Sequence, residues 1–120
     1  MVIVVFQDGR DWTVPNWVFR QVARDIDSLW GSELGVSDAL QKARATGHLP
    51  LDRLEASLAC RLTVHLGEIA KRTLNGELGG WKAANPDDAE GHAMYDRCLD
   101  ALSALLAQGR GRPTSQSARC

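Results

Sequence analysis

The sequence predicts a mainly α-helical domain with a small β element: an N-terminal β-hairpin followed by a compact bundle of about four helices. Two observations carry this prediction. An apolar run over 2–6 precedes Asp8-Gly9, a dipeptide typical of hairpin turns. After Pro15, apolar residues recur at spacings of three and four, which is the pattern of amphipathic helices. Because 120 residues fall in the usual size range of one domain, we expect a single globular domain over 1–108.

The hairpin is expected over 2–14, with a two-residue turn at Asp8-Gly9. This turn defines a register, which pairs Phe6 with Asp11, Val5 with Trp12, Val4 with Thr13 and Ile3 with Val14. In that register one face packs on the helices, formed by Ile3, Val5, Trp12 and Val14. The other face leaves the apolar side chains of Val2, Val4 and Phe6 in solvent. They lie opposite Thr13 and Asp11.

A lone two-stranded hairpin is marginally stable in water, so the second face and the free edge of residues 2–6 both need cover. The sequence therefore predicts that the hairpin joins a sheet across a chain boundary, as a homodimer or with a partner's strand. The alternative is cover from within the chain, by the third or fourth helix or by the 75–85 loop.

The four helices are expected over 16–31, 38–46, 51–75 and 86–108. The third helix is apolar on opposite sides, with Cys60 and Val64 facing away from its main stripe, which is typical of a central helix. Glu55 falls inside that stripe, and we expect it to face solvent near the start of the helix. Before the fourth helix, Asn85 suits the N-cap and Pro86 the first helical position. Residues 109–120 contain Gly, Pro, Ser and Arg without periodicity and predict a flexible basic tail.

Composition excludes several classes of protein. The formal net charge of −1 creates no global field that would favour nucleic acid or an anionic membrane. The run over 2–6 is too short to span a bilayer and lacks the flanks of a signal peptide. The three cysteines form no CxxC pair, which indicates free thiols in a reducing compartment and hence a cytoplasmic location.

Two groups of side chains could carry metal or acid–base chemistry. Asp88, His92 and Asp96 lie four residues apart along one side of the fourth helix, but two turns are a long span for one ion. We therefore interpret them as a solvated polar face and predict no metal. His65 and Glu68 could form a general-base pair or half of a metal site, although a boundary histidine beside a Glu68–Arg72 ion pair is the favoured interpretation.

Nucleophilic and cofactor chemistry have little support in the sequence. Cys60 lies in the middle of a largely apolar helix, where a thiol is usually inert. The chain contains no nucleophile elbow, no P-loop and no dinucleotide-binding glycine motif, so no catalytic residue and no cofactor are predicted.

The distribution of tryptophan and charge points instead to protein binding. Residues 86–108 carry five acidic side chains and one basic side chain. On the first helix, Trp17 lies on the polar side, where Trp flanked by Arg is typical of an interface hot spot. The alternative is that Trp17 packs under the hairpin or another loop. The predicted partner-binding residues lie on these two helices: Trp17, Arg20, Arg24, Asp27, Asp88, His92, Asp96 and Asp100.

These features favour a small protein-binding module, most specifically an inhibitor of the bacterial immunity-protein or antitoxin type. An acidic helix over 86–108 could cover the basic groove of a nuclease toxin, where complementary charge speeds association. One alternative is an enzyme, a metal- or ligand-binding helical bundle whose site contains His65 and Glu68. The other is a structural homo-oligomer. Nucleic-acid binding is not favoured, because acidic neighbours interrupt the basic residues.

Overall fold

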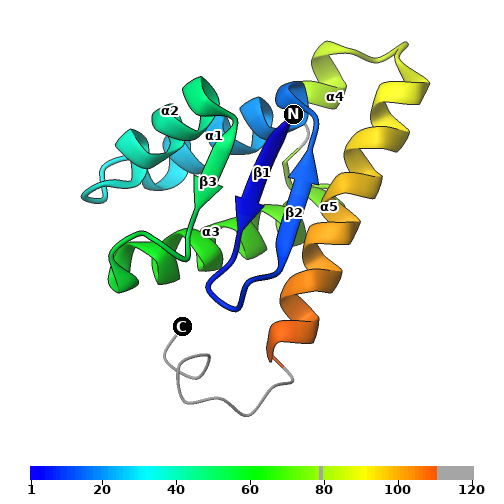
Figure 1. Cartoon of the computed structure of the whole chain (residues 1–120). Helices are drawn as coiled ribbons and strands as arrows, with labels where there is room; N and C mark the ends of the chain where they lie inside the picture. The colour runs from blue at the N-terminus through cyan, green and yellow to red at the C-terminus, as the bar shows by residue number, and fades with distance from the viewer. Residues whose placement is uncertain (79, 111–120) are drawn as a thin grey trace.

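The computed structural model describes residues 1–78 and 80–110, with side chains up to residue 107. Its fold is mainly helical with a small N-terminal sheet, as the sequence predicts (Figure 1). The elements along the chain are β1 (Val2–Val5), β2 (Asp11–Val14), α1 (Asn16–Trp30), α2 (Val36–Thr46), β3 (His48–Pro50), α3 (Ala56–Leu74), α4 (Gly80–Ala84) and α5 (Ala89–Arg110). The predicted tail lies outside the described residues from residue 111 onward.

The hairpin forms where predicted, but its register differs by one residue. Val4 pairs with Trp12 and Val2 with Val14, because the turn contains three residues and not two. The Phe6 N–H donates to the Arg10 carbonyl at 2.8 Å, and Gly9 adopts a left-handed φ of 89° that closes the loop. The predicted two-residue turn and its pairing are therefore wrong.

This shift exchanges the two faces of β1 relative to β2, since side chains alternate along a strand. The apolar residues of both strands now share one buried face, made by Val2, Val4, Phe6, Trp12 and Val14. Ile3, which the predicted register places against the helices, is 40% exposed. All large apolar side chains of the hairpin except Ile3 and Val5 are thereby buried in the described core.

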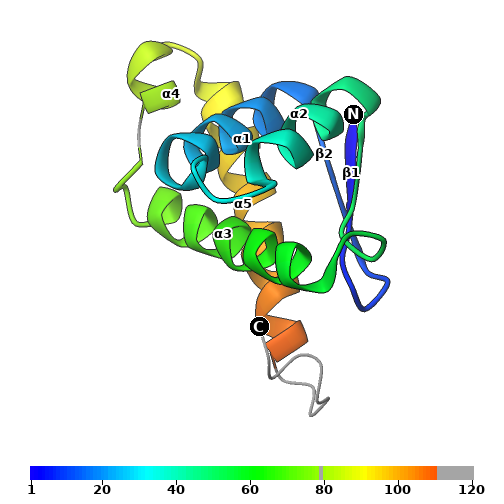
Figure 2. The same cartoon turned by 90° about the vertical axis from the view of Figure 1, so that its left-hand side faces the viewer.

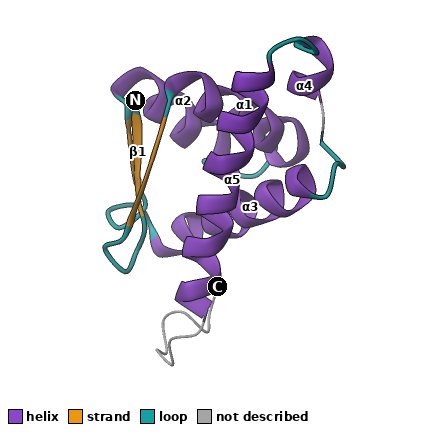
Figure 3. Ribbon diagram, turned by 90° about the vertical axis from the view of Figure 1, so that its right-hand side faces the viewer, coloured by secondary structure: helices purple, strands orange, loops and turns teal. Residues whose placement is uncertain are grey.

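A third strand covers the edge of β1, which the sequence leaves open. β3 pairs with β1 in parallel, so the sheet order is β2-β1-β3. The Ile3 N–H donates to the Gly47 carbonyl at 3.0 Å, and the Leu51 N–H donates to the Val5 carbonyl at 2.9 Å. The prediction of an open edge at residues 2–6 is therefore wrong, and this edge gives no reason for a homodimer. The helices lie on one side of the sheet (Figures 2 and 3).

The helix α1 begins where predicted, whereas α3 and α5 begin later in the sequence than predicted. Glu55 is the N-cap residue of α3. Its carboxylate accepts from the N–H groups of Ser57 and Leu58 at 3.0 and 3.1 Å. The helix thus begins at residue 56 and not at 51, and Glu55 is exposed as expected. At α5, Asp88 takes the capping role predicted for Asn85: its carboxylate accepts from the Gly91 N–H at 2.9 Å.

The core lies between the sheet and the helices, with α3 packed against both α1 and α5. Only one side of the apolar pattern on α3 is fully covered, since Val64 on the far side is 47% exposed. Cys98 is a free thiol, in line with the prediction for this residue. In the part of the chain that the structure describes, none of the helices combines the length and apolarity needed to cross a bilayer.

Candidate functional site

An aromatic cluster joins the start of α1 to α4 and the start of α5. The rings of Trp17 and Trp81 lie 4.7 Å apart between centroids, and Trp81 stacks on Tyr95 at 5.5 Å with an interplanar angle of 7°. The His92 ring meets Trp81 edge-on at 5.4 Å. Trp17 is half-buried against these rings, so the structure supports the second of the two interpretations, in which Trp17 packs under another segment.

Polar contacts hold α4 over this cluster. Lys82 Nζ forms an ion pair with Asp96 Oδ1 at 2.6 Å. The His92 Nε2 lies 2.7 Å from the carbonyl oxygen of Asn85, which follows α4 directly. These contacts occupy two of the side chains that the sequence assigns to a partner, and the cap at the start of α5 occupies Asp88. Among the predicted acidic residues of α5, Asp100 is exposed.

The same three residues give no metal site. Asp88, His92 and Asp96 each face a different protein group, and no cluster of three or more metal-ligating side chains occurs among the described residues. His92 is instead oriented by a backbone carbonyl and an indole ring.

Burial shifts the pKa of Tyr95, which belongs to this cluster, and that of Asp25. Burial raises the pKa of the Tyr95 hydroxyl well above its ordinary value of 10.0, and the negative charge of Asp25 raises it further. Burial also raises the pKa of Asp25, against a hydrogen bond from Gln21 and the charge of Arg24. Tyr95 therefore stays protonated at neutral pH and acts as a packing residue.

A second cluster surrounds His65 on α3, which is only 7% exposed. Its Nε2 lies 2.8 Å from Glu33 Oε1, and its ring stacks on Trp30 at 4.2 Å with an angle of 4°. Arg61 lies 3.7 Å from the same carboxylate oxygen of Glu33. The alternative pair of His65 with Glu68 does not form, because the partner of His65 comes from the segment between α1 and α2.

Glu68 pairs with Arg72 at 2.9 Å, which confirms that part of the prediction. Arg72 also lies over the Trp30 ring, 5.6 Å from its centroid. The sequence could not indicate Glu33, since it stands 32 residues from His65 and belongs to no periodic pattern. These contacts fix the end of α1 onto α3, with one ring nitrogen of His65 engaged and one ring face covered.

Exposed apolar side chains adjoin this second cluster. Leu34 is 88% exposed, and its carbonyl accepts from Arg61 at 3.4 Å. Val64, which is 47% exposed, lies one turn from Arg61 along α3. We call this surface the α1–α3 face and define it by Trp30, Glu33, Leu34, Arg61, Val64 and Arg72.

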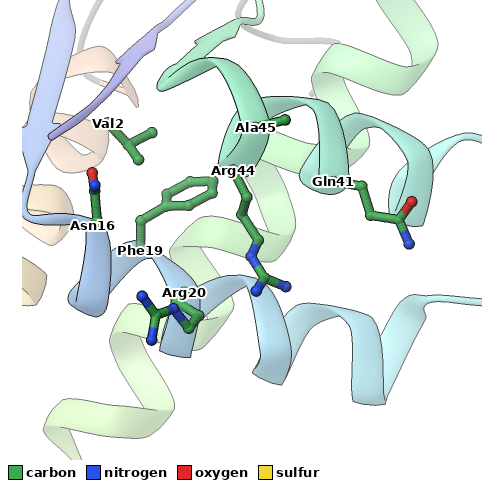
Figure 4. Close-up of a pocket in the computed structure, with 7 residues that line it drawn as sticks. All are labelled: Val2, Asn16, Phe19, Arg20, Gln41, Arg44 and Ala45. Atoms are coloured by element: carbon green, nitrogen blue, oxygen red, sulfur yellow. The ribbon is translucent and has the colours of Figure 1, made fainter.

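The remaining predicted partner-binding residues lie on α1. Arg20, Arg24 and Asp27 are all exposed. Arg20 additionally lines a hollow between α1 and α2 together with Arg44, a residue that no sequence pattern indicates (Figure 4).

Comparison with known proteins yields no relative: no family model, no curated protein and no solved structure matches this chain.

Proposed function

We propose that the protein is a protein-binding module whose partner docks on the α1–α3 face. The observation that carries this proposal is Leu34, a large apolar side chain that is 88% exposed, whose carbonyl accepts from Arg61. Interface hot spots are enriched in Trp and Arg, and an exposed apolar group rimmed by polar residues is typical of a docking surface.

The rim of this face is already ordered. Arg61 is held by Glu33 and by the Leu34 carbonyl, and Arg72 is held by Glu68 and lies over Trp30. Binding of a partner would therefore cost less side-chain entropy than it would if these arginines were free. The side chain of Leu34 makes few contacts in the unbound protein, so most of its apolar surface is available to a partner.

The more specific proposal is a cytoplasmic inhibitor of the immunity-protein or antitoxin type. It is supported by the acidic α5 segment, whose exposed carboxylates include Asp87, Glu90 and Asp100. Such a surface would complement the basic substrate groove of a nuclease toxin. Asp100 is the best probe of this second surface, because Asp88 and Asp96 have structural contacts of their own.

The test is affinity purification from the native host with three variants and the unchanged protein. L34D places a charge in the centre of the α1–α3 face, and D100K reverses the charge of the acidic surface. A104D is the matched control, since Ala104 is also exposed and lies elsewhere on α5. Purified partner and variants are then recombined, and the dissociation constant is measured by titration calorimetry.

We expect one partner protein that binds the unchanged chain and A104D equally, and that binds L34D at least tenfold more weakly. Loss of binding in D100K with normal binding in L34D would move the partner to the acidic surface and overturn the assignment to the α1–α3 face. Equal binding of a recovered protein to all four chains would overturn both surfaces. Sedimentation of the purified protein as a stable dimer that buries Leu34 would replace the module with a homo-oligomer.

A further inference from the structure

A hollow with a volume of about 370 Å³ lies where β1, α1 and α2 meet. Its walls contain basic, amide and apolar side chains and no acidic ones: Val2, Asn16, Phe19, Arg20, Gln41, Arg44 and Ala45. Figure 4 shows Arg44 extending from α2 toward α1, on the same side as the guanidinium of Arg20. The buried side chains of Val2 and Phe19 form its inner wall.

Among the residues that the structure describes, the two arginines of this hollow have no negative partner. Within the described residues, the ion pairs involve other basic side chains, and neither guanidinium has a hydrogen-bond acceptor. Asp38, the acidic residue of α2, pairs with Lys42. Two positive charges thus line one concave surface whose own residues do not neutralise them, and an anion would remove their mutual repulsion.

The start of α1 adds to the positive potential. Asn16, at one side of the hollow, is the first residue of this helix. The residue before it is Pro15, which provides no side-chain cap, and the first turn contains no acidic residue. The positive end of the helix dipole is therefore left uncompensated next to Arg20, which favours a bound anion.

We infer that this hollow binds the phosphate group of a small phosphorylated molecule. A phosphate monoester carries a charge between about −1.5 and −2 at neutral pH, which matches the two guanidinium groups, whereas a single carboxylate would leave one of them uncompensated. Planar guanidinium groups donate pairs of hydrogen bonds to phosphate oxygens. The amides of Asn16 and Gln41 supply further donors. The volume lies in the usual range for small-ligand pockets.

This site shares no residue with the α1–α3 face, so the inference can be tested independently of the proposed protein partner. Its test is a titration of the isotope-labelled protein with inorganic phosphate and with glycerol phosphate, at constant ionic strength, followed by the side-chain Nε–Hε resonances of the arginines. Sodium chloride and sodium acetate serve as comparison salts. The variants are R20Q, R44Q and the matched control R24Q, since Arg24 is exposed on the same helix but does not line the hollow.

We expect the resonances of Arg20 and Arg44 to shift and saturate with both phosphates, and that of Arg24 to shift no more than in chloride. R20Q and R44Q should each weaken binding at least about tenfold, because each removes charge-assisted hydrogen bonds, and R24Q should leave it unchanged. Because Arg44 also lies in the last turn of α2, where it offsets the helix dipole, R20Q is the decisive variant.

Two results would overturn the inference. Shifts that stay linear and equal to those in chloride would show that the arginines are only solvated surface charges. If acetate binds as tightly as phosphate, the ligand group of the hollow would be a carboxylate and not a phosphate. Tighter binding of glycerol phosphate than of inorganic phosphate would support an ester as the ligand, and the reverse order would also overturn the inference, because the ligand would then be the free ion.

Discussion

Replacement of Trp17 by alanine is the most informative single change, because it separates a packing role from an interface role. Truncation of a fully buried tryptophan costs about 3–5 kcal/mol of unfolding free energy. Trp17 is half-buried and meets two rings, with centroids 4.7 Å from Trp81 and 6.1 Å from Tyr95. We therefore expect W17A to lower the unfolding free energy by about 2 kcal/mol, an amount scaled from the same range by its partial burial.

The specific contact with Trp81 can be isolated by a double-mutant cycle. Aromatic pairs in contact contribute about 0.5–1.5 kcal/mol beyond the burial of area. The W17A and W81A changes should therefore be non-additive, with a coupling energy of about 1 kcal/mol. The control cycle pairs Trp17 with Trp30, which stacks on His65 at the other end of α1. Its coupling should stay below about 0.5 kcal/mol, since distant sites are additive.

The assay is urea denaturation followed by far-ultraviolet circular dichroism, whose signal comes mainly from the helices that all the variants share. Hydrogen exchange of the His92 amide gives a local measure of the start of α5. A loss below about 0.5 kcal/mol in W17A, the size typical of ordinary surface substitutions, together with no coupling to Trp81, would refute the packing argument. It would restore Trp17 as an exposed anchor for a partner.

Three further changes test other parts of the structure. G9A should cost about 1 kcal/mol in urea denaturation, because Gly9 has a φ of 89° and an added Cβ would meet nothing within 4 Å, so the cost is conformational alone; an unchanged midpoint would contradict the three-residue turn. E55A should cost about 1 kcal/mol through loss of the two capping bonds, with E55D as the variant that retains a cap, and equal loss in both would count against the cap. Since burial raises the pKa of Asp25 in the folded state above the ordinary 3.8, its ionisation destabilises the fold as pH rises through that raised pKa. D25N should therefore be more stable than the unchanged protein at neutral pH and equally stable below the ordinary pKa, and a constant difference at all pH values would show that ionisation is not the cause.

The elements that follow local periodicity were predictable from the sequence. The helices α1 and α2 lie within two residues of their predicted bounds, because apolar spacing and flanking Pro or Gly are local signals. The hairpin is likewise located by the apolar run and by Asp8-Gly9. Even the surface pair of Glu68 and Arg72 was predictable, since residues four apart on a helix are neighbours by geometry.

What the sequence could not determine depends on contacts between distant segments or on a difference of one residue in a loop. A two-residue and a three-residue turn at Asp8-Gly9 have almost the same local sequence, yet they place opposite faces of β1 in the core, and the burial of Val2, Val4 and Phe6 selects between them. β3 contains only three residues and is a strand because it pairs with β1. The partner of His65 and the hollow that Arg20 and Arg44 both line arise in the same way, from segments that pack together although they are distant in sequence. Periodicity along a chain specifies which side of an element is apolar, but only packing in three dimensions decides which elements those sides meet.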